Sequence, residues 1–189
     1  MRLFPYLGAG VAGAVLFSVP GFGAAPNDWK LQVTQEKEDF ALTVPVSRLT
    51  LRIPKEGLLE ERASQGGATD NPRYFQFRGA KKGIIISGWF EAEKRFTSAK
   101  KEWEKDTKEW NRRGLAAPKE VVFEKIDGWD AVLYDMPIPS ASNSHVRAHW
   151  VQAGTWIDIH LSVTSERSRS ECREQLISLL KSIKVKEKK

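Results

Sequence analysis

The sequence predicts an α+β fold: a twisted antiparallel sheet of three hairpins with helices packed on its faces. Three observations lead to this class. Segments with the two-residue alternation of strands come in pairs joined by short turns. Consecutive hairpins of this kind require antiparallel pairing. Two segments with helical spacing, one in mid-chain and one near the C-terminus, are long enough to cover the faces of such a sheet.

The first 25 residues have the order of a secretory signal peptide. Arg2 precedes an apolar stretch that runs from Leu3 to Val19, and small residues follow it. The stretch is interrupted by glycines and is shorter than the roughly 20 apolar residues of a spanning helix. We therefore expect cleavage after Gly23 or Ala25 and a periplasmic or secreted protein without stable membrane insertion. The alternative is an uncleaved N-terminal anchor.

The rest of the chain is predicted to be a polar lead-in, residues 26–39, and a single α+β domain, residues 40–189. The chain has 30 Lys and Arg against 24 Asp and Glu, and its net charge of +6 is spread along the sequence. No nucleic-acid-binding motif accompanies this charge, so we expect no nucleic-acid partner. Cys172 is the only cysteine, so no internal disulfide can form, and its spacing from Leu176 and Leu179 predicts a buried apolar position.

The strands are predicted in chain order. Residues 46–54 alternate leucine and isoleucine with polar residues, and Pro54 ends this first strand. In the second of three hairpins, Asp127 and Gly128 suit a two-residue type I′ turn, because glycine accepts a positive φ. The hairpins pair residues 73–78 with 83–91, 121–126 with 129–134, and 145–152 with 155–163.

Two amphipathic helices complete the domain. The first covers residues 97–113, where Trp103 and Trp110 recur on one face among lysines and glutamates. These tryptophans are predicted to anchor the helix to the sheet rather than to line a ligand site. The second helix covers about 169–182 and leads into a short Ile-Lys-Val segment.

The third hairpin carries the best candidate for a functional site. If Ala153 and Gly154 form its turn, residues i and 307−i lie opposite each other, and apolar side chains share one face. The other face holds a polar cluster in which His149 lies opposite Asp158 and Arg147 lies opposite His160. The residues of this predicted surface cluster are Arg147, His149, Asp158 and His160.

Three interpretations of the polar cluster remain open. Imidazoles and a carboxylate can converge on a metal ion. A histidine oriented by a carboxylate can act in acid–base catalysis. Cross-strand ion pairs and hydrogen bonds can also simply stabilise an outward sheet face. The last interpretation requires the fewest assumptions about how the side chains are placed, so we predict no catalytic, cofactor-binding or metal-binding residue.

The order of these segments resembles the Mog1/PsbP-like sandwich, which includes bacterial exported proteins of the DcrB and related families. The resemblance rests on RLTLRIPKEG near the start, on GWDAVLYD in mid-chain and on GTWIDIHLSVTS before the last helix. It covers about residues 40–186. These motifs are turn glycines and strand cores, so the resemblance implies a fold and non-enzymatic attachment to a larger protein, and it transfers no catalytic residue.

Together these observations predict a non-enzymatic, exported protein that binds another protein. Either an envelope accessory factor or an immunity-type protein fits. Aromatic residues of the first hairpin, such as Tyr74, Phe75 and Trp89, would form a partner patch if left exposed. The alternative is a small-molecule or metal-binding envelope protein that uses the sheet face of residues 147–160. No cofactor is expected.

Overall fold

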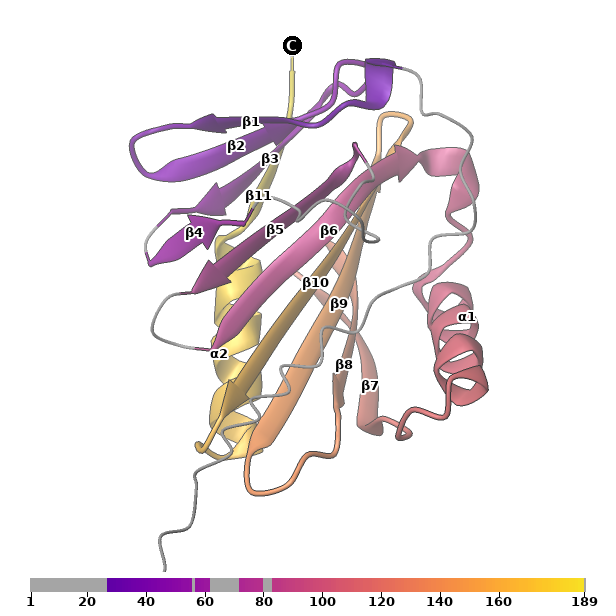
Figure 1. Ribbon diagram of the computed structural model, residues 1–189. Coiled ribbons are helices and arrows are strands. Elements are labelled where there is room, and N and C mark those ends of the chain that lie inside the picture. Colours follow the sequence, from indigo (N-terminus) through magenta and orange to yellow (C-terminus); the bar gives the residue numbers. More distant parts are fainter. Residues whose placement is uncertain (1–26, 56, 62–71, 80–82, 189) are drawn as a thin grey trace, which may run out of the picture.

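The structure is a computed structural model that describes residues 27–55, 57–61, 72–79 and 83–188 (Figure 1). The predicted signal peptide, residues 1–25, lies outside the described residues, so its cleavage and the export that it implies stay predictions. Among the helices of the described ranges, none is long and apolar enough to cross a membrane.

The strands form two antiparallel sheets. The four-stranded sheet has the order β1 (Gln32–Gln35), β2 (Asp39–Thr43), β3 (Leu49–Pro54) and β11 (Lys184–Glu187). The seven-stranded sheet has the order β4 (Leu58–Glu60), β5 (Tyr74–Gly79), β6 (Ile84–Ala92), β10 (Thr155–Ser165), β9 (Ser142–Gln152), β8 (Trp129–Asp135) and β7 (Lys119–Ile126). The helical segments are η1 (Asn27–Trp29), η3 (Glu93–Arg95), α1 (Ala99–Arg112) and α2 (Arg169–Ser182).

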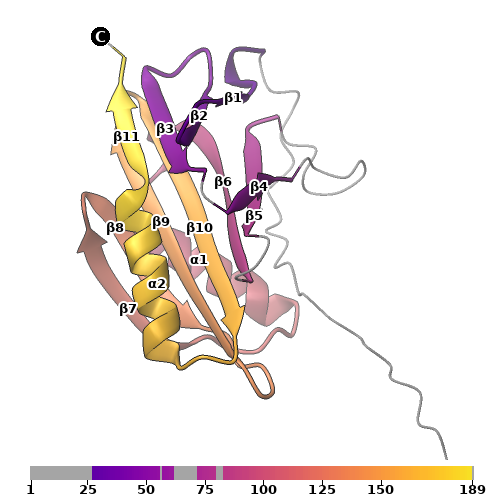
Figure 2. The same cartoon turned by 90° about the vertical axis from the view of Figure 1, so that its left-hand side faces the viewer.

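The main core lies on one face of the seven-stranded sheet. The four-stranded sheet and α2 cover that face, and α2 runs directly into β11 (Figures 1 and 2). Leu51, Ile159 and Leu176 bring the three elements into one fully buried cluster. Helix α1 lies on the other face, where Trp103 and Trp110 pack against Val132 and Tyr134 of β8. The prediction that these tryptophans anchor α1 to the sheet is confirmed.

The predicted α+β class is wrong, because the described chain is mainly β, with two large antiparallel sheets and two α-helices. The predicted lead-in, residues 26–39, contains the strand β1 and the start of β2, and the Ile-Lys-Val ending leads into β11. These segments are short and polar on at least one side, so no hydrophobic alternation marks them. Their pairing around β3 makes the second sheet that the sequence did not indicate.

The three predicted hairpins are confirmed, and all lie in the seven-stranded sheet. Both residues of each two-residue turn have positive φ: 48° and 91° at Asp127 and Gly128, and 50° and 77° at Ala153 and Gly154. The register of the third hairpin is the predicted one, since Gln152 pairs with Thr155. This register fixes which side chains of β9 and β10 share a face.

Gly88 lets β6 approach β10 beside the polar cluster. A Cβ atom there would lie 2.2 Å from the carbonyl oxygen of Asp158 and 2.7 Å from the ring of Phe75. We therefore expect Gly88→Ala to lower the free energy of unfolding by about 1–3 kcal/mol, as overpacking does. The measurement is urea denaturation, with Gly79→Ala as the control, because its nearest contact is 3.3 Å away. Equal midpoints for the two variants would contradict this prediction.

Candidate functional site

The structure brings the four residues of the predicted polar cluster together on one face of β9 and β10. His149 lies opposite Asp158 and Arg147 lies opposite His160, as predicted. The side-chain contacts are nevertheless diagonal, because Arg147 reaches Asp158 rather than the residue opposite it. His160 likewise contacts His145, which neighbours the cluster on the same face of β9.

The cluster is not the surface cluster that the sequence predicted. The exposed fraction is 4% for Arg147, 1% for His149, 1% for Asp158 and 8% for His160. The prediction failed because an alternating hairpin shows which residues share a face but not what covers that face. Here α1 packs over part of it, and Phe96, just before α1, contacts the ring of His149.

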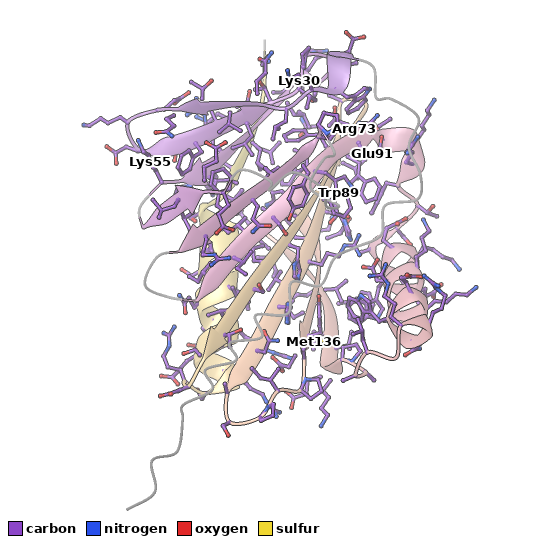
Figure 3. All side chains as sticks on the ribbon, in the orientation of Figure 1. Lys30, Lys55, Arg73, Trp89, Glu91 and Met136 are labelled. Atoms are coloured by element: carbon purple, nitrogen blue, oxygen red, sulfur yellow. The ribbon has the colours of Figure 1, made fainter. Side chains whose placement is uncertain are left out.

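Arg147 is the centre of the cluster. Its Nε donates to Oδ1 of Asp158 at 3.1 Å and its Nη2 donates to Oδ2 at 2.6 Å, so the pair is bidentate. Its Nη1 forms an ion pair with the carboxylate of Asp106, a residue of α1. The guanidinium also lies 5.7 Å from the ring of Trp89, a side chain labelled in Figure 3. One buried cation therefore ties α1 to β10 through two carboxylates.

His149 is held in a neutral form by its neighbours. The indole N–H of Trp156 donates to its Nδ1 at 3.2 Å, so that nitrogen accepts and the proton resides on Nε2. Asp158 Oδ1 lies 3.6 Å from the same Nδ1. Phe96 packs against both rings, with centroids 5.3 Å from each. Among the described residues, Nε2 of His149 has no hydrogen-bond partner.

Three stacked rings continue the network toward the other end of β9. The rings of Tyr134, His145 and His160 have nearly parallel planes, and the ring of His145 lies 4.8 Å from that of Tyr134 and 5.1 Å from that of His160, centroid to centroid. Nδ1 of His145 lies 3.0 Å from Nε2 of His160, which is also 3.1 Å from the hydroxyl of Tyr134. Within the described ranges, Nε2 of His145 lacks a hydrogen-bond partner.

Burial keeps the three imidazoles uncharged. Desolvation lowers the pKa of His145 to about 4, although Asp135 acts in the opposite direction. Desolvation also lowers the pKa of His149 to about 4, against the attraction of Asp158. The pKa of His160 falls well below its ordinary value through burial and then through His145 and Arg147. At neutral pH the formal charges of the cluster are therefore those of Arg147 and its carboxylate partners.

The geometry of the cluster suits a structural network. Its cation and carboxylates bind one another, and the rings stack on one another. No three His, Cys, Asp or Glu side chains in the described part of the chain are arranged to hold a metal ion. Buried polar networks of this kind fix one arrangement of the elements around them. Here those elements are α1, β8, β9 and β10.

A second candidate site, which the sequence analysis missed, is the outer edge of β7. This strand ends the seven-stranded sheet and lies at its margin in Figure 2. Val122 and Phe123 are 44% and 46% exposed, and Leu115, just before the strand, is 40% exposed. An edge strand presents backbone N–H and C=O groups that another strand can pair with. Apolar side chains on such an edge favour that pairing.

The other edge strands of the described sheets are short or polar, whereas β7 carries exposed apolar side chains between its charged residues. β4 has three residues, and β1 has the polar sequence Gln-Val-Thr-Gln. β11 carries Lys184 and Lys186, and lysine on an edge discourages pairing with another chain. β7 has a register shift between Lys119 and Val122, but its pairing with β8 is continuous from Val122 onward. The exposed apolar part of an edge strand is therefore that of Val122 and Phe123 in β7.

The aromatic residues of the first hairpin, which would form a partner patch if left exposed, lie mostly in the core. Phe75 and Phe77 of β5 and Phe90 of β6 are buried, with exposed fractions of 4% or less. Tyr74 and Trp89 are half-buried. The run Val-Val-Phe at residues 121–123 was the sequence signal that could have indicated the exposed apolar site on β7. Its meaning depends on β7 being the last strand of the sheet, which periodicity does not reveal.

In comparisons with known proteins, the chain matches no family model and no curated protein. The resemblance to the Mog1/PsbP-like and DcrB-like proteins thus stays a prediction.

Proposed function

We propose that the protein is an exported, non-enzymatic binding module that takes an extended segment of a partner protein onto the edge of β7. The location, periplasmic or secreted, rests on the order of residues 1–25. Both an envelope accessory factor and an immunity-type protein remain versions of this proposal. The observation that carries it is the presence of two exposed apolar side chains, Val122 and Phe123, on an edge strand.

The β7 edge has the properties needed for strand addition. In this mode, main-chain hydrogen bonds supply affinity and alternate side chains supply specificity. Seven of the eight residues from Lys119 to Ile126 are at least partly exposed, so both sides of the strand are accessible to a partner. The ring of Phe123 also makes an edge contact with the ring of Trp103 on α1, with the centroids 6.4 Å apart. A half-exposed aromatic side chain that is held in place by such a contact is a suitable anchor for an interface.

The test is a photo-crosslinking experiment on the mature protein in native envelope extract. A photoreactive residue replaces Val122, and the cross-linked partner is identified by mass spectrometry together with the position of the cross-link. We expect one protein, joined through an extended segment. In a separate affinity-retention assay, the variant Val122→Lys, which carries no photoreactive residue, is expected to retain about tenfold less of that protein.

Val46→Lys is the matched control. Val46 is 50% exposed, lies in the turn between β2 and β3, and is far along the chain from β7. Val46→Lys makes the same change of charge and size as Val122→Lys but away from β7. The Val46→Lys variant should therefore retain the partner as the native protein does. Equal loss in the two lysine variants, or cross-links that do not depend on the β7 position, would contradict the proposal.

Binding of a small molecule or a metal ion by the face of residues 147–160 is the second candidate. It is favoured by two buried ring nitrogens, Nε2 of His145 and Nε2 of His149, that have no partner among the described residues. Because Nε2 of His149 carries the proton, it suits a small molecule that accepts a hydrogen bond, whereas a metal ion would require the other tautomer and the loss of the hydrogen bond from Trp156. Stoichiometric metal in the purified mature protein that is lost in His149→Ala would favour this candidate over the first.

A further inference from the structure

The turn that joins β7 to β8 determines which backbone groups of β7 point outward. This two-residue turn is closed by Ile126 and Trp129, which lie directly opposite each other. Such a closing pair exchanges both backbone hydrogen bonds, so the N–H and C=O groups of Ile126 point toward β8. The direction alternates along an antiparallel strand. The N–H and C=O groups of Phe123 and of Lys125 therefore point away from β8, where another strand can pair with them.

The part of this edge that another strand can use is short. Arg173 of α2 donates to the carbonyl oxygen of Glu120 at 2.7 Å, and the backbone of Glu120 has a φ of 50°. The pairing of β7 with β8 is irregular between Lys119 and Val122 and regular from Val122 to the turn. Another strand therefore meets regular extended backbone only over residues 122–126.

A second copy of the chain fits this edge in one antiparallel register. In a two-fold antiparallel pair, the residue at the centre lies opposite its own copy. A centre at Glu124 or at Lys125 places like charges directly opposite each other, which destabilises a sheet. A centre at Val122 requires Phe123 to pair with Val121, which lies in the irregular part of the strand. A centre at Phe123 has neither defect.

The register centred on Phe123 joins side chains that β7 leaves exposed. The two Phe123 residues, each 46% exposed, would lie opposite each other and exchange their outward backbone hydrogen bonds. Their rings would meet on the face of the sheet where Phe123 contacts Trp103 of α1, and aromatic pairs across strands stabilise a sheet. On the other face, Val122 would lie opposite Glu124 of the second copy, so no like charges meet.

We propose that a second copy of the chain occupies the β7 edge in this register, which joins two seven-stranded sheets into one across a two-fold axis at Phe123. A pair of this kind is closed, so it also protects the apolar edge from open-ended pairing. Its regulatory meaning rests on the function proposed above, because both occupants use the same edge. The dimer is the closed form of the site, and the partner segment binds by displacing the second copy.

Cysteine cross-linking of the mature protein tests the register. The native Cys172 is fully buried, so introduced cysteines react without it. Directly opposite residues have Cα atoms roughly 4.5–5.5 Å apart, which a disulfide can bridge, whereas diagonal residues lie too far apart. A mixture of Val122→Cys and Glu124→Cys, one of them tagged, is expected to give about tenfold more disulfide-linked dimer under mild oxidation than either variant alone.

Sedimentation of the native protein at several concentrations measures the dimer without any cross-link. The variant Val122→Lys places a cation opposite Glu124 of the second copy, so it should tighten the dimer about fivefold, whereas Val46→Lys should leave its affinity unchanged. Weaker self-association of Val122→Lys, or cross-linking of Val122→Cys with itself, would overturn the register.

The outcomes also separate this proposal from the proposed function. A native protein that stays monomeric at every concentration, with no cross-link in the cysteine mixture, would overturn the dimer and leave the partner segment as the occupant of β7. A dimer in this register, together with photo-crosslinking from residue 122 that yields only a second copy of the chain, would support the dimer and overturn the binding of another protein.

Discussion

Lowering the pH from about 7 to about 4 is expected to remove a large part of the folding stability. Burial lowers the pKa of His145 and that of His149 to about 4, and the pKa of His160 is lowered as well. In the unfolded chain these groups have ordinary values of about 6.5. Below that pH the unfolded state binds protons that the folded state does not, so the free energy of unfolding falls. Above it the contribution is fully present.

The size of this effect follows from the lowered pKa values of His145 and His149. A difference of roughly 2.5 pH units corresponds to about 3 kcal/mol for each of His145 and His149 by pH 4. A typical domain has about 5–15 kcal/mol of stability. The protein is therefore expected to begin losing its resistance to urea between about pH 6 and pH 5, where ordinary surface carboxylates are still mostly ionised, and to lose most of it as the pH approaches about 4.

Urea denaturation at several pH values between about 7 and 4 measures the effect. The variant His149→Phe is the control, because a phenyl ring can pack between Phe96 and Trp156 and does not titrate. The free energy of unfolding of this variant should fall less steeply with decreasing pH, and the difference in slope should correspond to the uptake of about one proton. Carboxylates whose pKa is lowered on folding affect the free energy of unfolding at lower pH. The pKa of Glu109, for example, is lowered to about 2 by Arg112 and Arg113. A flat profile between pH 7 and 5 would contradict the prediction.

Arg147→Leu is expected to lower the free energy of unfolding by about 3–5 kcal/mol. The substitution leaves Asp158, with 1% of its surface exposed, without the bidentate cation that neutralises it. It also removes the partner of Asp106 on α1. Breaking a buried ion pair by removing one member has a cost of this size, because the remaining charge stays desolvated.

Two further variants identify the cause. Arg112→Leu removes the same side chain from an exposed ion pair with Glu109, and its effect should be much smaller because solvent screens that pair. The double variant Arg147→Leu with Asp158→Leu should recover part of the loss, because apolar pairs can replace buried ion pairs. A double variant no more stable than Arg147→Leu would show that lost packing, not a stranded carboxylate, explains the effect.

The elements that the sequence predicted well are those whose signal is local. Turn residues at 127–128 and 153–154 define two hairpins, and the hydrophobic spacing of Trp103 and Trp110 places α1 against the sheet. The hairpin register also placed His149 opposite Asp158 correctly. Each of these depends only on neighbours along the chain or across one turn.

What the sequence did not reveal depends on the order of the strands. The hairpin of β9 and β10 is central because β6 pairs with β10 and β8 pairs with β9, and its polar face is buried because α1 and Phe96 cover it. β7 is exposed because the sheet ends there. Neither position is encoded by alternation within a strand. The polar strand β1 was missed for a different reason: it gains its stability from pairing with β2 rather than from a hydrophobic face.

The pairing of β11 with β3 has a consequence for the time course of folding. Val185, four residues from the C-terminus, pairs with Leu51, so the contact spans more than two thirds of the chain. Closing so long a loop is slow and comes late. The four-stranded sheet thus stays incomplete until residues 184–187 have been synthesised. Late completion of this sheet suits a chain that is proposed to cross a membrane before it folds.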